Sequence, residues 1–209
     1  MTIATAGMGA DAYPVTIDVT PDGGDRNRLT VAFRPILAIP HALLIGGPSI
    51  SVLFGAYWAG DFDWFSWGGA GVLGLVAGVC AVIAWFAILF TNNHPRGLWD
   101  LAHFYLRWRV RALPYMMLLQ DKYPPFGEEP SENRVAIEYP EAARDKLSVG
   151  LRLFYLIPHL FLLFFLWIGW FVTAVIAWFA ILFTGRYPES LQEFAMGVLR
   201  WSTRVEAYQ

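Results

Sequence analysis

Charged residues are scarce in this chain of 209 residues, at 15% of the total, against about 25% in typical soluble domains. Hydrophobic residues make up 56%, and the mean hydropathy is +0.44. This composition is typical of a membrane protein. The formal net charge of −2 lacks the basic excess that nucleic-acid binding requires. We therefore predict membrane lipids as partners, and no nucleic acid.

Cysteine occurs once, as Cys80, so the chain cannot form an intramolecular disulfide or a zinc site of the usual cysteine spacing. Cys80 lies in an apolar run, and we interpret it as a buried structural thiol. No glycine-rich phosphate loop follows a strand pattern. Asp61 and Asp63 form a carboxylate pair without an acid–base partner. The sequence therefore predicts no catalytic residue, no metal site and no enzyme.

Three long stretches carry no Asp, Glu, Lys or Arg, namely 35–60, 64–95 and 153–185. A helix that crosses a bilayer needs about 20 apolar residues. The first two stretches therefore predict spans at 36–57 and 69–90. The third is too long for one ordinary span and short for two.

The basic residues decide how the third stretch is interpreted. None of the fifteen Lys and Arg residues falls in the 58–68 loop or near Gly169. A hairpin with its turn at 167–170 puts all of them on one face of the membrane, as the positive-inside rule requires. We therefore predict spans at 151–167 and 170–184, with both termini in the cytoplasm. One continuous span and a partly re-entrant hairpin are the alternatives.

The sequence AVIAWFAILFT occurs twice, at 81–91 and at 174–184. Downstream, Arg107-Trp108 aligns with Arg200-Trp201; upstream, Ile-Pro-His at 39–41 aligns with Ile-Pro-His at 157–159. The first copy carries extra residues between these blocks. We predict a duplicated unit, with repeats at 1–126 and 127–209. An even number of spans in each copy makes them parallel repeats about an axis along the membrane normal.

Each copy has the same predicted order of elements. Short alternating segments predict strand pairs at 13–33 and 134–150. After each hairpin, 96–119 and 188–207 combine an arginine stripe with many aromatic residues, which predicts amphipathic helices in the cytoplasmic interface. Packing beneath the spans is the alternative. The fold class is thus an all-α membrane protein: four transmembrane helices as two parallel-repeat hairpins, two interfacial helices, and short cytoplasmic strand pairs.

Basic and aromatic residues at aligned places in the two copies are candidates for binding lipid head groups or a protein partner. They are Arg34, Arg107, Trp108, Arg111, Arg152, Arg200, Trp201 and Arg204. Anchoring of the spans by positive charge alone is the alternative interpretation.

His41 and His159 form the second candidate site. Two histidines at similar depth in a helix bundle have the residue type that holds a haem iron. The alternatives are local hydrogen bonding at the kinks of Pro40 and Pro158, and proton transfer. No cofactor is predicted, and haem remains an alternative.

The segment WFAILFTGRYPESLQEFAMGVLRWSTRVEAY, together with its earlier copy and with LLQDKYPPF, resembles the bacterial membrane family known as domain of unknown function 4389. The resemblance covers most of the chain. It implies a multi-pass protein of the bacterial inner membrane, and it transfers no catalytic residues. The copies differ in two places: Asn-Asn-His replaces Gly-Arg-Tyr in the first, and the second has no match to LLQDKYPPF.

Three functions are compatible with these observations. The first is a non-enzymatic accessory or scaffold subunit of a larger membrane complex, with lipids and other proteins as partners. The second is a small lipid-handling or transport protein with a site between the repeats. The third is a haem-binding electron carrier that uses His41 and His159.

Overall fold

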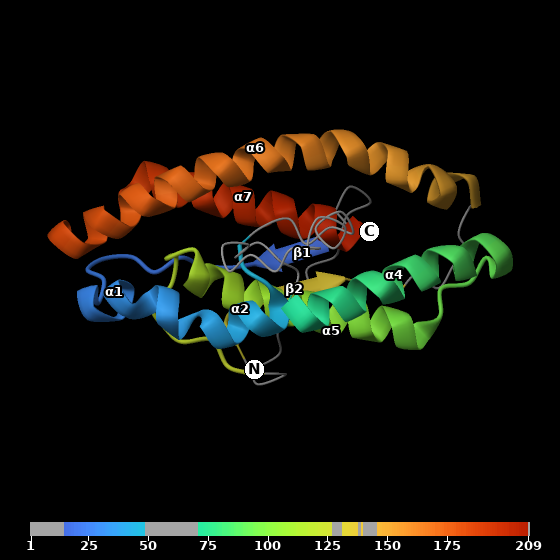
Figure 1. Ribbon diagram of the computed structural model, residues 1–209, viewed down its shortest axis with the longest axis horizontal. Coiled ribbons are helices and arrows are strands. Elements are labelled where there is room, and N and C mark those ends of the chain that lie inside the picture. The colour runs from blue at the N-terminus through green and yellow to red at the C-terminus, as the bar shows by residue number, and fades with distance from the viewer. Residues whose placement is uncertain (1–14, 49–70, 127–130, 138, 140–145, 209) are drawn as a thin grey trace, which may run out of the picture.

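A computed structural model describes residues 15–48, 71–126, 131–137, 139 and 146–208 (Figure 1). The described elements are β1 (Val15–Asp18), α1 (Arg28–Leu37), α2 (Ile39–Ile45), α4 (Gly71–Thr91), α5 (Arg96–Met116), β2 (Arg134–Ile137), α6 (Lys146–Thr184) and α7 (Glu189–Tyr208). The fold is mostly helical, as predicted.

The two strands form one antiparallel sheet, with Val15 opposite Ile137 and Asp18 opposite Arg134. Each copy contributes one strand, so the sheet joins the copies. The second strand predicted in each pair is wrong, because 28–33 lies in α1 and 146–150 lies in α6. Helix prevails at 28–33 because the Asn27 side chain caps the first free backbone N–H groups of α1.

Two helices, α4 and α6, are long and apolar enough to cross a membrane. The pair α1–α2, bent by 41°, is a third candidate if it counts as one span. The prediction at 69–90 corresponds to α4, where Cys80 is half-buried rather than buried. The prediction at 36–57 begins in α1 and α2, and its part from residue 49 onward lies outside the described residues.

Helix α6 runs without interruption through 39 residues, so the predicted hairpin with a turn at 167–170 is wrong. The physical reason is that nothing breaks the helix there. No proline follows Pro158 within α6, and Gly169 stands alone among strongly apolar neighbours. At 1.5 Å per residue α6 is about 58 Å long, almost twice a hydrocarbon core of about 30 Å.

The apolar helices of the two copies run antiparallel along each other (Figure 1). At one end Trp178 Nε1 donates to the carbonyl of Val31 at 3.0 Å, and at the other Trp85 Nε1 donates to the carbonyl of Val149 at 2.9 Å. The two tryptophans are aligned in the repeat, and each valine stands three residues before the aligned arginine. The same contact therefore occurs twice, with the copies exchanged.

The helices predicted at 96–119 and 188–207 are present as α5 and α7. Their central turns are buried together with the sheet and part of α6. This core includes Val110, Leu113, Val135, Trp167 and Leu199. These faces pack against protein, as in the alternative interpretation of the two helices.

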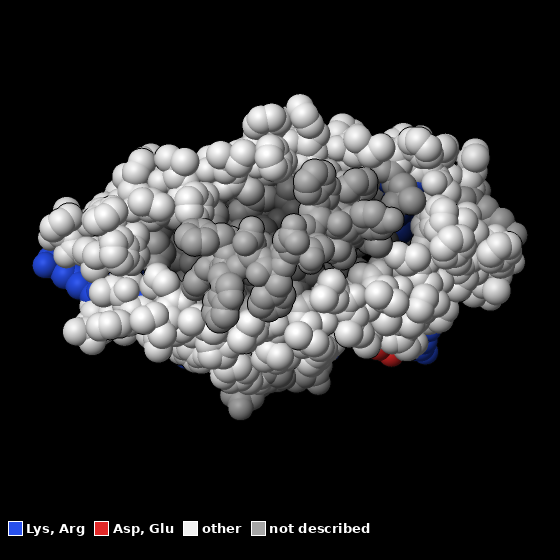
Figure 2. All heavy atoms as spheres, viewed as in Figure 1, with Lys and Arg blue, Asp and Glu red and all other residues white. Residues whose placement is uncertain are grey.

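The outer faces of α4 and α6 leave large apolar side chains exposed. Examples on α6 are Phe154, Phe161, Phe164, Phe171 and Phe183, with exposed fractions between 56% and 78%. In Figure 2, the described atoms of a broad face include few charged residues, and the Lys, Arg, Asp and Glu that are visible lie mainly toward its edges. The described molecule therefore has an extended apolar surface.

Candidate functional site

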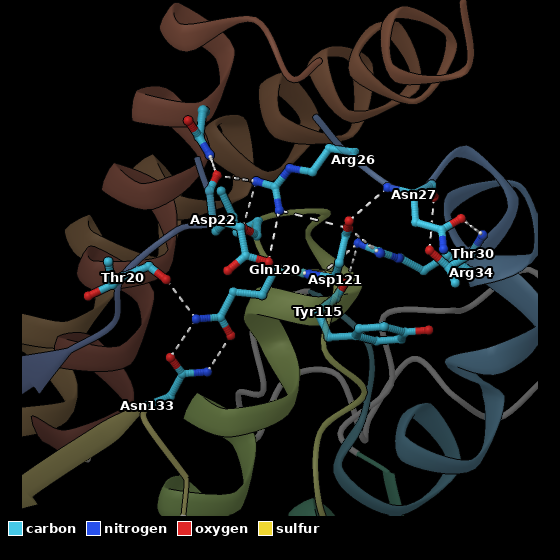
Figure 3. A network of polar contacts seen from close by, with 12 residues as sticks. Thr20, Asp22, Arg26, Asn27, Thr30, Arg34, Tyr115, Gln120, Asp121 and Asn133 are labelled. Atoms are coloured by element: carbon cyan, nitrogen blue, oxygen red, sulfur yellow. Dashed lines mark hydrogen bonds and ion pairs between the residues drawn. The ribbon is translucent and has the colours of Figure 1, made fainter. Parts of the chain in front are cut away.

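Arg34 is almost fully buried and pairs with Asp121 (Figure 3). Its Nη2 donates to Asp121 Oδ1 at 2.7 Å, and its Nη1 donates to the carbonyl of Gln120 at 2.9 Å. Its guanidinium lies 4.5 Å from the centre of the Tyr115 ring. Arg34 was predicted as a lipid or partner contact, but here its charge is matched within the chain and holds the segment after α5.

Arg26, which the sequence analysis did not single out, lies in the same network. Its Nη2 donates to the carbonyls of Asp22 at 2.7 Å and Leu119 at 2.8 Å, and its Nη1 lies 3.1 Å from the Asp22 carboxylate. Burial lowers the pKa of the Arg26 guanidinium, and the carboxylates of Asp121 and Asp22 oppose that shift. Two arginines thus converge on the start of the segment 118–126.

His41 is fully buried, and the same segment covers it. The Phe126 ring stacks on the imidazole, with centroids 4.3 Å apart and planes 13° apart. Tyr123 lies 5.1 Å away, and Trp108 presents an edge contact at 6.3 Å. We call Arg34, His41, Trp108 and Tyr115 the first cluster; residues 118–126 of the chain itself fill it.

The aligned residues of the other copy form a second cluster: Arg152, His159, Trp201 and Tyr208. The Arg152 guanidinium lies 4.9 Å from the centre of the Tyr208 ring, and the ring centroids of His159 and Trp201 are 6.3 Å apart. The first cluster repeats this arrangement at 4.5 Å and 6.3 Å. The arginine, histidine and tryptophan positions were predicted as aligned candidates from the sequence, whereas the two tyrosines were not among the predicted site residues.

The second cluster borders an open groove of about 440 Å³ between α6 and α7. Its lining residues are Tyr155, Leu156, His159, Trp201, Arg204, Val205 and Tyr208. Among the described residues, none takes the place here that Asp121, Tyr123 and Phe126 take in the first cluster. One cluster is therefore filled and the other open.

The two histidines lie in separate clusters and do not contact each other. Phe126 covers one face of the His41 ring, whereas His159 is exposed at the groove. Across the described part of the chain, no group of three or more His, Cys, Asp and Glu residues could hold a metal ion. This arrangement gives the haem hypothesis no support.

The remaining predicted residues differ in their surroundings. Arg107 and Arg111 are half-buried and interact within the chain. Arg200 and Arg204 are exposed, and Arg204 lines the groove. Of the two aligned tryptophans, Trp108 is 8% exposed and Trp201 is 37% exposed. The candidates that present substantial surface are therefore Arg200, Trp201 and Arg204 of the second copy.

The most deeply buried ion pair, Arg109 with Glu206, was missed. Arg109 Nε donates to both Glu206 carboxylate oxygens, at 3.0 and 2.9 Å, and its Nη1 donates to the carbonyl of Ile45 at 3.0 Å. Burial acts to lower the pKa of Arg109, but Glu206 and Tyr105 together outweigh it and raise the pKa. The aligned positions hold Ser202 and Leu113, so the repeat could not reveal this pair. The available signal was the place of Arg109 on the apolar side of α5, one turn from Leu106 and from Leu113.

A family model described as a domain of unknown function, DUF4389, matches the chain twice, over residues 66–127 and 146–209. The two matches fall in the two copies of the repeat and include both helices α5 and α7. No curated protein and no solved structure matches the chain. The comparisons therefore identify a family and assign it no activity, ligand or partner.

Proposed function

This chain belongs to the DUF4389 family of domains of unknown function, and we propose that it is a non-enzymatic accessory subunit or scaffold of a membrane complex. One observation carries the proposal, namely the exposed apolar surface of α4 and α6. Only 22% of each candidate span is buried within the molecule. Soluble monomers rarely expose continuous apolar patches larger than a few hundred Å². A lipid bilayer is the environment in which such a surface is favourable.

The charged residues support a particular placement in the membrane. Lys122 and Glu132 form an ion pair with side chains 81% and 86% exposed. Glu132 is two residues before β2, which lies near the middle of the long axis of the molecule (Figure 1). If α6 crossed the bilayer along its length, this pair would lie at the depth of the hydrocarbon, where charges are costly. We therefore place α6 along the membrane, with both ends on the cytoplasmic side of a bacterial inner membrane.

The polar interior supports a structural role over a catalytic one. In the described core, Arg26, Arg34 and Arg109 are matched by carboxylates of the same chain. Charges that satisfy one another hold the fold and are not available to a substrate. Arg152 of the open second cluster has no ion pair with a described residue, so its charge is available to a partner.

Membrane fractionation followed by mass spectrometry of the intact assembly tests this proposal. We expect the chain in the membrane fraction after a high-salt wash, and in a larger complex of defined composition after extraction in mild detergent. The double variant F161D/F165D, on the outer face of α6, should lower membrane retention. Lys122→Glu, at an exposed site near the sheet, is the matched control. A chain recovered in the soluble fraction, or alone after gentle extraction, would contradict the proposal.

A further inference from the structure

We infer that the open groove of the second cluster binds an extended peptide segment of a protein partner, with a carboxylate followed by aromatic and proline residues. The inference rests on the proposed function, since it specifies which kind of peptide the accessory subunit would bind in its protein partner. It comes from a comparison within the molecule: the first cluster already holds such a segment, and the second cluster repeats its receptor residues.

The first cluster shows how the segment is held. Asp121 accepts a hydrogen bond from Arg34 at 2.7 Å. Two residues later, the Tyr123 ring meets Tyr115 edge-on at 5.4 Å. Phe126 then stacks on His41. One carboxylate and two rings, with Pro124 and Pro125 between the rings, thus contact an arginine, a tyrosine and a histidine.

The second cluster offers the same three receptors in the same arrangement. Arg152 lies over Tyr208 as Arg34 lies over Tyr115. His159 has Trp201 at its edge as His41 has Trp108. The receptors of both clusters therefore match in residue type and in mutual geometry.

Arg152 differs from Arg34 in lacking a carboxylate. The Nε of each arginine is buried without a hydrogen-bond partner, but Arg34 has an ion pair with Asp121, whereas no ion pair joins Arg152 to a described residue. A buried guanidinium N–H without an acceptor is costly, and a carboxylate is its strongest partner. The groove therefore favours an acidic residue at the position that Asp121 has in the first cluster.

The groove also has a suitable size. Its volume of about 440 Å³ falls within the range of about 300–1,000 Å³ for ligand pockets. Aromatic walls, here Trp201, Tyr155 and Tyr208, commonly bind proline-containing extended segments. The sequence contains LLQDKYPPF once, and that segment occupies the first cluster. Because no described residue of the chain fills the second groove, the occupant that we propose is a segment of another protein.

Fluorescence anisotropy with the labelled peptide LLQDKYPPF tests this inference on the full chain in detergent micelles. We expect saturable binding that weakens about tenfold or more when the peptide aspartate is replaced by asparagine, because a charge-assisted hydrogen bond contributes about 1.5–3 kcal/mol. The protein variants R152Q and W201A should weaken binding by a similar factor. Arg34→Gln, the matched substitution in the first cluster, should leave it unchanged.

Three results would overturn the inference. The first is an absence of saturable binding. The second is binding that R34Q abolishes and R152Q spares, since the peptide would then displace residues 118–126 from the first cluster. The third is unchanged peptide binding in R152Q with loss of copurifying anionic lipid, which would make the groove a lipid site. Circular dichroism of each variant verifies folding, and a photoreactive group at the peptide phenylalanine locates the contact.

The proposed function can fail separately from this inference. If the chain forms a defined membrane complex but does not bind the peptide, the docking role stands and the groove assignment is wrong. If the peptide binds but the chain is recovered alone from native membranes, the groove assignment stands and the subunit role is wrong.

Discussion

At the scale of single residues, the buried charges of this protein are mostly matched within the chain. Arg109 is 0% exposed and its partner Glu206 is 6% exposed at the side chain, so the pair is closed to water. Such a pair adds little net stability over apolar residues of similar size, but loss of one partner leaves an uncompensated buried charge. Replacement of one partner should therefore destabilise the fold much more than replacement of both.

Glu206→Gln should destabilise the fold by about 3–5 kcal/mol, because the Arg109 guanidinium would remain buried without its carboxylate. The double variant R109M/E206M should recover most of that loss. The midpoint of thermal unfolding, followed by tryptophan fluorescence in one detergent, measures both. Arg200→Gln, at an exposed position of α7, should change stability by less than about 0.5 kcal/mol. Equal destabilisation by the single and double variants would show that the pair does not act as a unit.

The buried side chain of Tyr187 makes the stability of the fold depend on pH in the alkaline range. Burial raises its pKa to about 12, with Arg26 acting in the opposite direction. The unfolded chain releases this proton near pH 10, so the contribution to stability is complete below pH 10 and is lost between about pH 10 and 12. The loss amounts to about 2–3 kcal/mol at most.

Tyr187→Phe should remove this part of the alkaline loss and change little at pH 7, because the hydroxyl has no hydrogen-bond partner among the described residues. Urea unfolding of the wild type and the variant at several pH values between 8 and 12 gives the difference. Burial also raises the pKa values of Tyr115 and Tyr123. Both groups are present in the wild type and in the variant, so their effects on stability cancel in the difference. Parallel pH curves for the two proteins would contradict the assignment.

At the scale of elements, hydropathy and periodicity predict α4, α5 and α7 well, because each has its own apolar or amphipathic pattern. They do not predict α6, because the positive-inside argument assumes that an apolar stretch crosses the membrane. They also fail at 28–33. Alternating apolar and polar residues there predict a strand, but the Asn27 side chain caps the first turn and the segment forms helix α1. The clusters could be found from the repeat, but their filled and open states depend on tertiary contacts.

The continuity of α6 predicts the effect of an alanine at its centre. An added Cβ at Gly169 would lie 3.4 Å from Phe194 Cζ, an ordinary van der Waals contact. Gly169→Ala should therefore stabilise the protein by up to about 1 kcal/mol, the helix-propensity difference. Gly185→Ala is the control and should destabilise it, since Gly185 has φ +79° and lies close to Arg28. Destabilisation by Gly169→Ala in thermal unfolding would instead favour a turn at this position.

At the scale of the whole molecule, one contact between the two copies occurs twice, because the tryptophan hydrogen bonds at either end of α6 recur with the copies exchanged. The strands pair once across the copies, and each copy contains its own cluster. The described atoms of the face seen in Figure 2 include few charged residues, and α4 and α6 leave large apolar side chains exposed. A face of this kind fits a molecule that lies in one leaflet better than one that crosses the bilayer lengthwise.

This placement predicts that the two ends of α6 lie on the same side of the membrane. In a background with Cys80→Ala, single cysteines at Leu147, which is 70% exposed, and at Ser190, which is also exposed, mark the two ends. A membrane-impermeant maleimide should label both in inside-out vesicles and neither in intact spheroplasts, because charged residues flank both ends and their transfer across the bilayer is costly. Permeabilised spheroplasts, in which both cysteines should react, control for accessibility. Labelling of one end in each preparation would mean that α6 crosses the membrane, and the exposed Lys122–Glu132 pair would then require a partner that shields it from lipid.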